Sequence, residues 1–401
     1  MNDVKAKNEY LFSKVPEVTI FFWIIKILCT TVGETFSDFI NVNMGLGLVP
    51  TTIVMGIAFA AVLFFQMRAK KYIPVLYWLT VVLISVFGTL VTDNLTDGLG
   101  VPLQFSTVLF SILLLATFFM WYRSEKTLSV HSIFTMRREV FYWLTILFTF
   151  ALGTAVGDLY SETLGLGYLL TGIIVTAIII SVFVIWKIFR IDSVLSFWVA
   201  YVFTRPLGAS LGDYLSQPRE NGGLGLGTTI TSIIFLAAIL AVIIILSVTK
   251  IDAKAKNTAE EGEKTSEAKR RALHQTVAVL CAFVVLGAGS YAWCSHAVAV
   301  KAQASGATLQ GHLDNFISIE TDIQSSVDAN DFSAAKTKAK ELETTWDTEA
   351  AQLKAIDKTG WKMIDATIDS VLSSVRKGRP DAAVCNAAIE SSLAVLNSIN
   401  Q

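Results

Sequence analysis

Seven carboxylates recur at related positions inside segments that are otherwise apolar, and their types and spacing could do chemistry. Four are aspartates that each follow a glycine by five residues, and three of these belong to carboxylate pairs spaced four residues apart, which share one helix face. The full set is Glu34, Asp38, Asp93, Asp97, Asp158, Glu162 and Asp213. Carboxylates gathered in this way would concentrate cations and replace part of an ion's hydration shell.

The ligand chemistry narrows the kind of cation. Oxygen donors suit hard ions such as Mg²⁺, Ca²⁺ and Mn²⁺, or protons. No His, Cys or Met stands in register with the acids, and the four cysteines form no CxxC pair, which disfavours zinc and copper. Hydroxyl groups that could add neutral oxygens stand nearby, at Thr35, Thr89, Thr92, Thr154 and Ser210. An architectural alternative stays open, because Asp before a glycine turn also caps helices and turns.

Two cations, Lys26 and Arg205, interrupt the same apolar segments without counterparts of like charge. The equivalent residues in the other segments are Val81, Ile146 and Tyr201 for Lys26, and Thr30, Ser85 and Phe150 for Arg205. A charge inside a bilayer is costly, so each cation is expected to pair with a carboxylate. Such a pair is either a gate that breaks when substrate or a proton binds, or a static bridge that fixes packing. The two cations also leave an anionic substrate open.

The composition places these residues in a membrane. Hydrophobic residues make up 53% of the 401-residue chain and charged residues 16%, with a mean hydropathy of +0.57, whereas soluble domains average about 45–50% and about 25%. The net charge of -1 gives no indication of nucleic-acid binding. The chain has no P-loop, nucleophile elbow, HExxH, kinase or haem motif. It is therefore not expected to be an enzyme, and any transport would be secondary or passive.

A fourfold internal repeat organises the chain. Each copy follows the pattern W-x9-G-x4-D, with an aromatic residue before the Trp and a glycine turn after the Asp. The signature residues are Trp23, Trp78, Trp143 and Trp198, with Gly33, Gly88, Gly153 and Gly208. The glycines would allow close helix approach. The Trp residues would be either anchors at the membrane interface or an aromatic wall inside the bundle.

Each repeat is long enough for two membrane helices. The sequence therefore predicts an all-α membrane protein with four parallel two-helix repeats, or eight spans, at about 15–67, 72–123, 137–190 and 192–249. Basic residues gather in the links between repeats and are nearly absent from the glycine turns, which places the links in the cytoplasm. The repeats then cross the membrane in the same sense, related by an axis along the membrane normal.

The remaining segments complete the predicted organisation. The segments are a cytoplasmic N-terminus at 1–14, the four-repeat transmembrane domain at 15–249, a cytoplasmic linker at 250–271, a ninth transmembrane helix at 272–299 and a periplasmic helical domain at 300–401. The first apolar segment is expected to be a retained helix, since no cleavage site follows it. An apolar face from Trp361 to Val375 predicts a C-terminal bundle of three or four helices with Trp in its core.

The four units resemble a bacterial four-repeat inner-membrane protein family of unknown function, with two transmembrane helices and one signature Trp in each repeat. The match covers roughly residues 14–250 and depends on the Trp, Gly and Asp positions given above. The resemblance implies a multi-pass protein of the bacterial inner membrane. It implies no substrate, and the segment beyond residue 300 lies outside it.

These observations predict a secondary transporter or exporter of a small cation, with a divalent metal such as manganese as the most concrete substrate. The seven carboxylates would bind the ion, and Lys26 and Arg205 would act as counter-charges or gates. The alternative is a membrane-anchored sensor or scaffold whose periplasmic helical domain binds a ligand or partner. A membrane enzyme acting on lipid is weaker, because no nucleophile or metal-ligand motif supports it. The expected partners are the lipid bilayer and the cation, no further cofactor is expected, and a homo-oligomer stays open.

Overall fold

The computed structural model contains helices and no strand in the part of the chain that it describes, which is residues 13–44, 46–99, 101–219, 222–252, 266–304 and 309–400. The repeat domain consists of α1 (Ile20–Asp38), α2 (Leu48–Arg68), α3 (Pro74–Asp93), α4 (Leu103–Glu125), α5 (Met136–Asp158), α6 (Tyr168–Phe189), α7 (Ser193–Ser216) and α8 (Gly227–Thr249). Short π-helical segments continue three of these helices, at Phe39–Asn43 after α1, Asn94–Gly98 after α3 and Leu159–Thr163 after α5.

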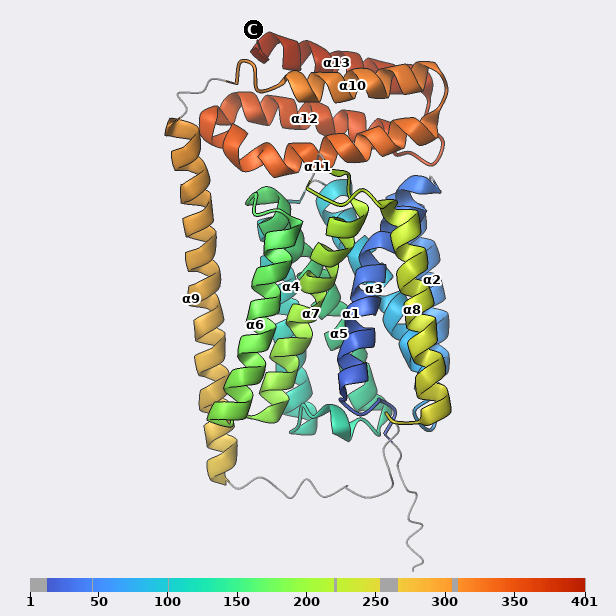
Figure 1. Cartoon of the computed structure of the whole chain (residues 1–401), viewed down its shortest axis with the longest axis vertical. Helices are drawn as coiled ribbons and strands as arrows, with labels where there is room; N and C mark the ends of the chain where they lie inside the picture. Colours follow the sequence, from blue (N-terminus) through green and yellow to red (C-terminus); the bar gives the residue numbers. More distant parts are fainter. Residues whose placement is uncertain are drawn as a thin grey trace, which may run out of the picture.

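All eight helices are long and apolar enough to cross a membrane, and so is Arg270–Cys294 within α9 (Ser266–Ala304). A further helix, α13 (Ala382–Asn400), meets the same criterion by length and composition but lies in a bundle across the end of the repeat domain (Figure 1). The described residues therefore form an all-α, multi-pass membrane protein, which confirms the predicted fold class. The predicted linker overlaps the start of α9, and its residues 253–265 lie outside the described residues.

The odd-numbered helices form a closed inner ring. α1 packs against α3 and α7, and α5 packs against the same two helices (Figure 1). Each even-numbered helix packs outside this ring against the first helix of the next repeat, with α2 on α3, α4 on α5, α6 on α7 and α8 on α1. In the apolar stretch of each inner helix, 56–67% of the residues are buried, against only 11–28% in each outer helix. The outer helices therefore present apolar faces to lipid. The repeats thus interlock around one axis, and the last closes on the first.

The signature glycines bring neighbouring inner helices into contact in the same way around the ring. A Cβ atom added to Gly33 would lie 2.7 Å from the Cβ of Ser85 on α3, and one added to Gly88 would lie 2.7 Å from the Cβ of Phe150 on α5. The same register joins Gly153 to Arg205 and Gly208 to Thr30. In every case the neighbour stands three residues before the glycine of the next repeat. Only glycine allows this approach, because a side chain would displace the neighbouring helix.

Three of the four signature Trp residues lie inside the bundle. Trp78, Trp143 and Trp198 are almost fully buried, and Trp23 is half-buried. The Nε1 group of Trp78 donates to the Tyr72 hydroxyl at 3.1 Å, which satisfies its polar edge within the protein. This burial favours the aromatic-wall interpretation over anchors at the lipid interface.

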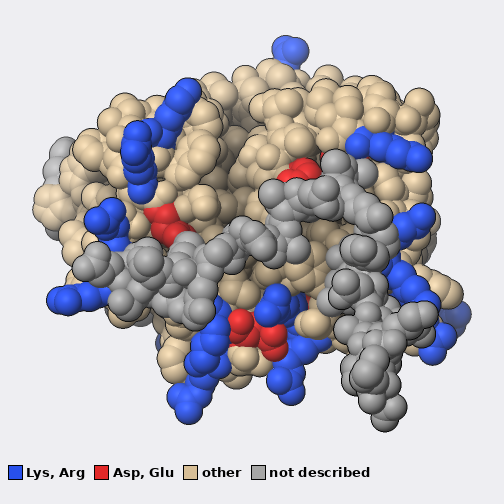
Figure 2. All heavy atoms as spheres, turned by 90° about the horizontal axis from the view of Figure 1, so that it is seen from below, with Lys and Arg blue, Asp and Glu red and all other residues tan. Residues whose placement is uncertain are grey.

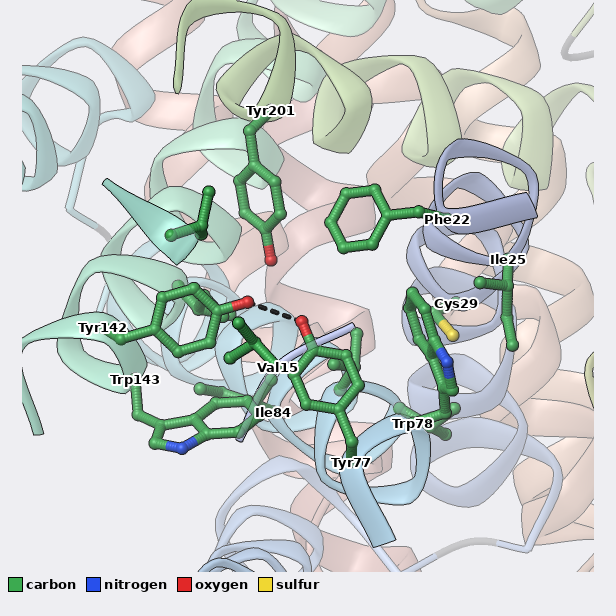
Figure 3. Packing of buried hydrophobic residues seen from close by; sticks show 14 of the residues in the cluster. Val15, Phe22, Ile25, Cys29, Tyr77, Trp78, Ile84, Tyr142, Trp143 and Tyr201 are labelled. Atoms are coloured by element: carbon green, nitrogen blue, oxygen red, sulfur yellow. Dashed lines mark hydrogen bonds between the residues drawn. The ribbon is translucent and has the colours of Figure 1, made fainter. Parts of the chain in front are cut away.

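Further aromatic side chains fill the axis beside these Trp residues. Phe22, Tyr77, Tyr142 and Tyr201 point toward one another in the middle of the ring (Figure 3). The hydroxyl oxygens of Tyr77 and Tyr142 are 2.5 Å apart, and the ring centroids of Phe22 and Tyr201 are 6.3 Å apart. The layer occupies the half of the bundle away from the aspartates, since each Trp precedes its Asp by fifteen residues.

A second domain with its own core covers one end of the repeat domain (Figure 1). It consists of α10 (Asp314–Asp328), α11 (Phe332–Ile356), α12 (Lys358–Val375) and α13. Trp346 stacks on Trp361 with ring centroids 5.9 Å apart, and its Nε1 group donates to Asp365 Oδ1 at 2.8 Å. The domain is thus a four-helix bundle with Trp346 in its core, and α11 is the helix that faces the repeat domain.

The two ends of the repeat domain are distinct in charge. The end that carries the glycine turns and the C-terminal domain is termed here the turn end, and the opposite end the link end. Figure 2 shows the link end, where Lys and Arg side chains rim the face. The exposed basic residues of the links include Arg68, Lys70, Lys71, Arg123, Lys126, Arg137, Lys187 and Arg190. Positive charge is therefore concentrated at the link end.

Candidate functional site: an acidic cavity at the turn end

A cavity lies at the turn end, between the inner ring and α11. Its volume is about 30 Å³, and since a buried water needs about 10–15 Å³ on this measure, it has room for about two or three waters or one small, partly hydrated ion. The lining residues are Glu34, Asp38, Asp93, Thr96, Asp97, Leu103, Asp158, Glu162, Asp213 and Gln217 from the repeat domain, and Lys340, Glu343, Thr344 and Asp347 from α11. All seven carboxylates singled out in the sequence thus line one cavity.

The helix geometry at the turn end explains how these acids come together. Asp38, Asp93 and Asp158 are each the last α-helical residue before a π-helical segment, so the helix continues past them. Asp97 and Glu162 lie in those π-helical segments, one turn nearer the end of the domain. Asp93 and Asp158, which stand directly before the π-helical segments, make no capping hydrogen bond with their side chains, which counts against the capping interpretation.

Arg205 of α7 lies beside the cavity, on its link-end side, and is fully buried. Its Nη2 atom lies 2.6 Å from Glu34 Oε2 and donates to Thr154 Oγ1 at 2.7 Å and to Thr89 Oγ1. Its Nη1 atom donates to the Thr30 carbonyl at 2.8 Å. Glu34, Thr89 and Thr154 each follow the signature glycine of their repeat. One guanidinium therefore binds the equivalent position of three repeats and ties α7 to α1, α3 and α5.

Lys26 was expected to pair with a carboxylate, but its ammonium group lies against aromatic rings instead. Its Nζ atom lies 3.7 Å from the ring centroid of Phe150 and 4.2 Å from that of Tyr201, and its side chain is buried. The faces of aromatic rings are negative and attract an ammonium group, which replaces the carboxylate. The sequence did not indicate this partner, because the rings that provide it belong to other repeats and carry no formal charge.

The C-terminal domain adds a charged helix face to the cavity. Lys340, Glu343, Thr344 and Asp347 are spaced three or four residues apart, so they share one face of α11. Arg376, which follows α12, donates from Nη1 to Glu343 Oε1 at 2.7 Å and from Nη2 to Glu343 Oε2. Burial by itself would raise the pKa of Glu343, but the charges of Arg376 and Lys340 outweigh it and lower that pKa to about 2. Glu343 is therefore a neutralised anion, held by a bidentate ion pair.

Lys340 is the cation that α11 turns toward the carboxylates of the repeat domain. Its Nζ atom lies 3.3 Å from Glu343 Oε2. Burial alone would lower the pKa of the Lys340 ammonium, but Glu343, Asp38 and Asp97 raise it well above its ordinary value. The pKa of Asp347 is also raised well above the ordinary range, in this case by burial and by the surrounding carboxylates together. The surrounding carboxylates thus favour the charged form of Lys340 and disfavour the ionised form of Asp347.

The arrangement of the acids does not amount to a formed metal centre. Over the residues that the structure describes, no group of three or more His, Cys, Asp or Glu side chains is placed to hold one metal ion. The carboxylates are instead spread around the cavity wall, with a lysine in the same lining. Such a wall attracts cations through its field and can exchange them.

The link end of the ring is closed by the segment that precedes α1. The Nζ atom of Lys14 lies 2.7 Å from Glu139 Oε2 and donates to the Met67 carbonyl at 2.8 Å. The Nε2 group of Gln66 donates to Glu139 Oε1 at 3.3 Å, and Glu139 is fully buried. Glu139 was not predicted from the sequence. The signal that could have found it is that this acid has no counterpart in the other repeats. The structure is therefore closed at the link end and covered at the turn end.

Comparison with known proteins identifies the repeat. A family model described as Repeat of Unknown Function (DUF347) matches the chain four times, at residues 21–72, 76–127, 141–192 and 196–252. No curated protein and no solved structure matches the chain. Together the four matches cover more than half of the chain, and each spans both helices of one repeat.

Proposed function

The chain belongs to the family of the DUF347 repeat, and from that premise we propose that it is a secondary transporter of a small cation, with the acidic cavity as its outer binding site. The observation that carries the proposal is that seven carboxylates, drawn from all four repeats, line one cavity at the end of a membrane-spanning ring. The helices continue past the repeated aspartates, so capping does not account for them. A ring of this kind concentrates cations at a pore mouth.

Arg205 and Glu34 couple the cavity to the closed part of the ring in this scheme. Glu34 belongs to the cavity wall and also binds Arg205. A cation that enters the cavity competes with the guanidinium for the Glu34 carboxylate. Loss of that ion pair weakens the contacts that join the four inner helices, because the same guanidinium also binds Thr89 and Thr154. Binding at the cavity would thereby favour separation of the inner helices.

The charge distribution supports an orientation for this transporter. Exposed basic residues rim the link end, and such residues favour the cytoplasmic side of a membrane. The cavity and the C-terminal domain would then face the periplasm of a bacterial cell. A divalent ion such as Mn²⁺ suits the oxygen ligands, and a proton is the simplest coupling ion.

Ion uptake into proteoliposomes tests the proposal. The purified full chain is assayed with Mn²⁺, Mg²⁺, Ca²⁺ and an imposed proton gradient, and the Asp93→Asn/Asp158→Asn variant is compared with Asp322→Asn. Asp322 lies on α10 and pairs with Lys338, away from the cavity. We expect the cavity variant to lower the initial rate about tenfold or more, a loss of about 1.4 kcal/mol, and the control to transport normally. Failure of every tested ion to cross faster than in empty liposomes would refute the proposal.

A second candidate function is a membrane-anchored sensor or scaffold. The observation that favours it is the C-terminal four-helix bundle, which has its own hydrophobic core and sits directly on the cavity. In that case the repeats would be a platform and the bundle would recognise a ligand or partner. The two candidates predict opposite effects of removing the bundle on ion transport.

A further inference from the structure

The C-terminal domain forms one wall of the acidic cavity. α11 packs against the π-helical segments Phe39–Asn43 and Leu159–Thr163, which extend the first helices of the first and third repeats. The segment after α12 also meets a glycine turn, since a Cβ atom added to Gly47 would lie 2.8 Å from the Arg376 carbonyl oxygen. Figure 1 shows α11 lying across the end of the ring. The domain thus covers the mouth at several points.

The charges at this contact are complementary. The repeat domain contributes seven carboxylates to the cavity, and Lys340 is the one base among the described residues that line it. Glu343 is already neutralised by Arg376. The neighbouring Lys338 forms its ion pairs elsewhere, with Asp322 Oδ2 at 3.3 Å and Glu341 Oε2 at 3.0 Å, both within the C-terminal domain. Lys340 also has an ion pair inside its own domain, with Glu343 Oε2 at 3.3 Å, but of these two lysines only Lys340 lines the cavity with the acids of the repeats.

We propose that the C-terminal domain is an autoinhibitory cover, in which Lys340 is a tethered cation that occupies the acidic cavity in competition with the transported ion. The competition rests on the function proposed above, whereas the cover itself does not. A tethered ammonium competes effectively, because attachment to the same chain gives it an effective concentration in about the millimolar range. The inner part of the cavity, where Asp38, Asp213 and Gln217 are buried, opens to solvent when α11 lifts and Lys340 leaves the carboxylates.

Thiol accessibility tests the cover without any measurement of transport. Gln217 lines the cavity, is buried and carries no charge, so Gln217→Cys is a reporter that keeps all seven carboxylates. The background carries Cys281→Ser and Cys294→Ser, because these two cysteines are not buried. The full chain in liposomes is treated with a neutral and with a cationic thiol reagent. Lys340→Gln is compared with Lys338→Gln, the same change on the same helix.

The expected result is that Lys340→Gln raises the rate of modification by the neutral reagent about tenfold, as when a state that holds about 90% of the molecules becomes open. The Lys338→Gln protein should react as slowly as the parent, and so should Lys340→Arg, which keeps the charge. Equal rates of thiol modification by the neutral reagent in Lys340→Gln and Lys338→Gln would overturn the proposal that the domain is a cover. An increase confined to the cationic reagent would also overturn it, since that result needs only a change of electrostatic potential. Ion transport with unchanged accessibility would refute the cover alone.

Discussion

Arg205 and Glu34 break the fourfold pattern where the four inner helices meet. The positions equivalent to Glu34 in the next two repeats are Thr89 and Thr154, and both bind the same guanidinium. The axis of the ring has space for only one guanidinium side chain. The symmetry of the repeats therefore cannot be complete there. The ion pair is consequently a structural bridge, and one of its partners, Glu34, also lines the cavity.

Removal of one partner of this pair should cost more stability than removal of both. Arg205→Met or Glu34→Gln alone leaves a buried charge without its partner, which costs about 3–5 kcal/mol, whereas replacing both charges by neutral groups is often close to neutral. We expect the Arg205→Met/Glu34→Gln protein to be more thermostable in detergent than either single variant, as measured by the fraction that stays monodisperse after heating. Additive losses in the double variant would show that the two residues do not act as a pair.

The sequence anticipated residues that repeat better than residues that do not. The four equivalent aspartates line one cavity, since a shared position in four similar helices places them around one axis, and the other three carboxylates stand four residues from an aspartate on the same helix face. Arg205 has a carboxylate partner, but Lys26 has aromatic rings, which no charge pattern indicates. Lys340 comes from a segment more than a hundred residues away from the last repeated Asp. Its spacing on one face with Glu343 and Asp347 was a usable signal, but only the fold shows what that face meets.

At the scale of helices, the order of packing was the part that the sequence left undetermined. The repeat predicted the helices and their direction, because length and charge set both. It did not predict that each outer helix packs against the first helix of the next repeat. An apolar helix has the same pattern whichever neighbour it meets. The π-helical geometry of three helices beyond the aspartates was also not indicated, since the spacing of the carboxylate pairs predicts only that the helix continues.

The glycine contacts of the inner ring should be more sensitive to substitution than glycines in outer helices. In Gly33→Ala the new Cβ would lie 2.7 Å from the Ser85 Cβ and 3.0 Å from its backbone carbon, so α1 and α3 must separate. Overpacking of this kind costs about 1–3 kcal/mol. In Gly172→Ala the nearest atom is the Ser210 Cβ at an ordinary 3.6 Å, and Ala gains about 1 kcal/mol of helix propensity.

Thermal stability in detergent measures this difference. We expect Gly33→Ala to unfold at a lower temperature than the parent, and Gly172→Ala at the same temperature or higher. The matched change isolates the ring contact, because both positions lie inside membrane helices. Equal stability of the two variants would show that the inner helices adjust to a methyl group without loss, contrary to the packing described above.

At the scale of the whole molecule, segments from outside the repeats close the link end and cover the turn end. Residues before α1 place Lys14 on the buried Glu139 at the link end, and α11 places Lys340 among the carboxylates at the turn end. Each closure therefore brings a lysine from a non-repeated segment to acids of the repeat domain. In the proposed transporter, the repeats would form the conduit and the flanking segments would control access to it.

Removal of the C-terminal domain should therefore increase transport. A chain that ends at Ala304 keeps α1 to α9 and loses Lys340, together with the rest of the cover. We expect its initial rate of ion uptake into liposomes to be several-fold higher than that of the full chain, because the acidic cavity is exposed without a competing ammonium. The Asp93→Asn/Asp158→Asn change in the truncated chain should abolish the gain, which separates true transport from leakage. Loss of uptake on truncation would instead indicate that the bundle is needed for function, as a sensor or scaffold requires.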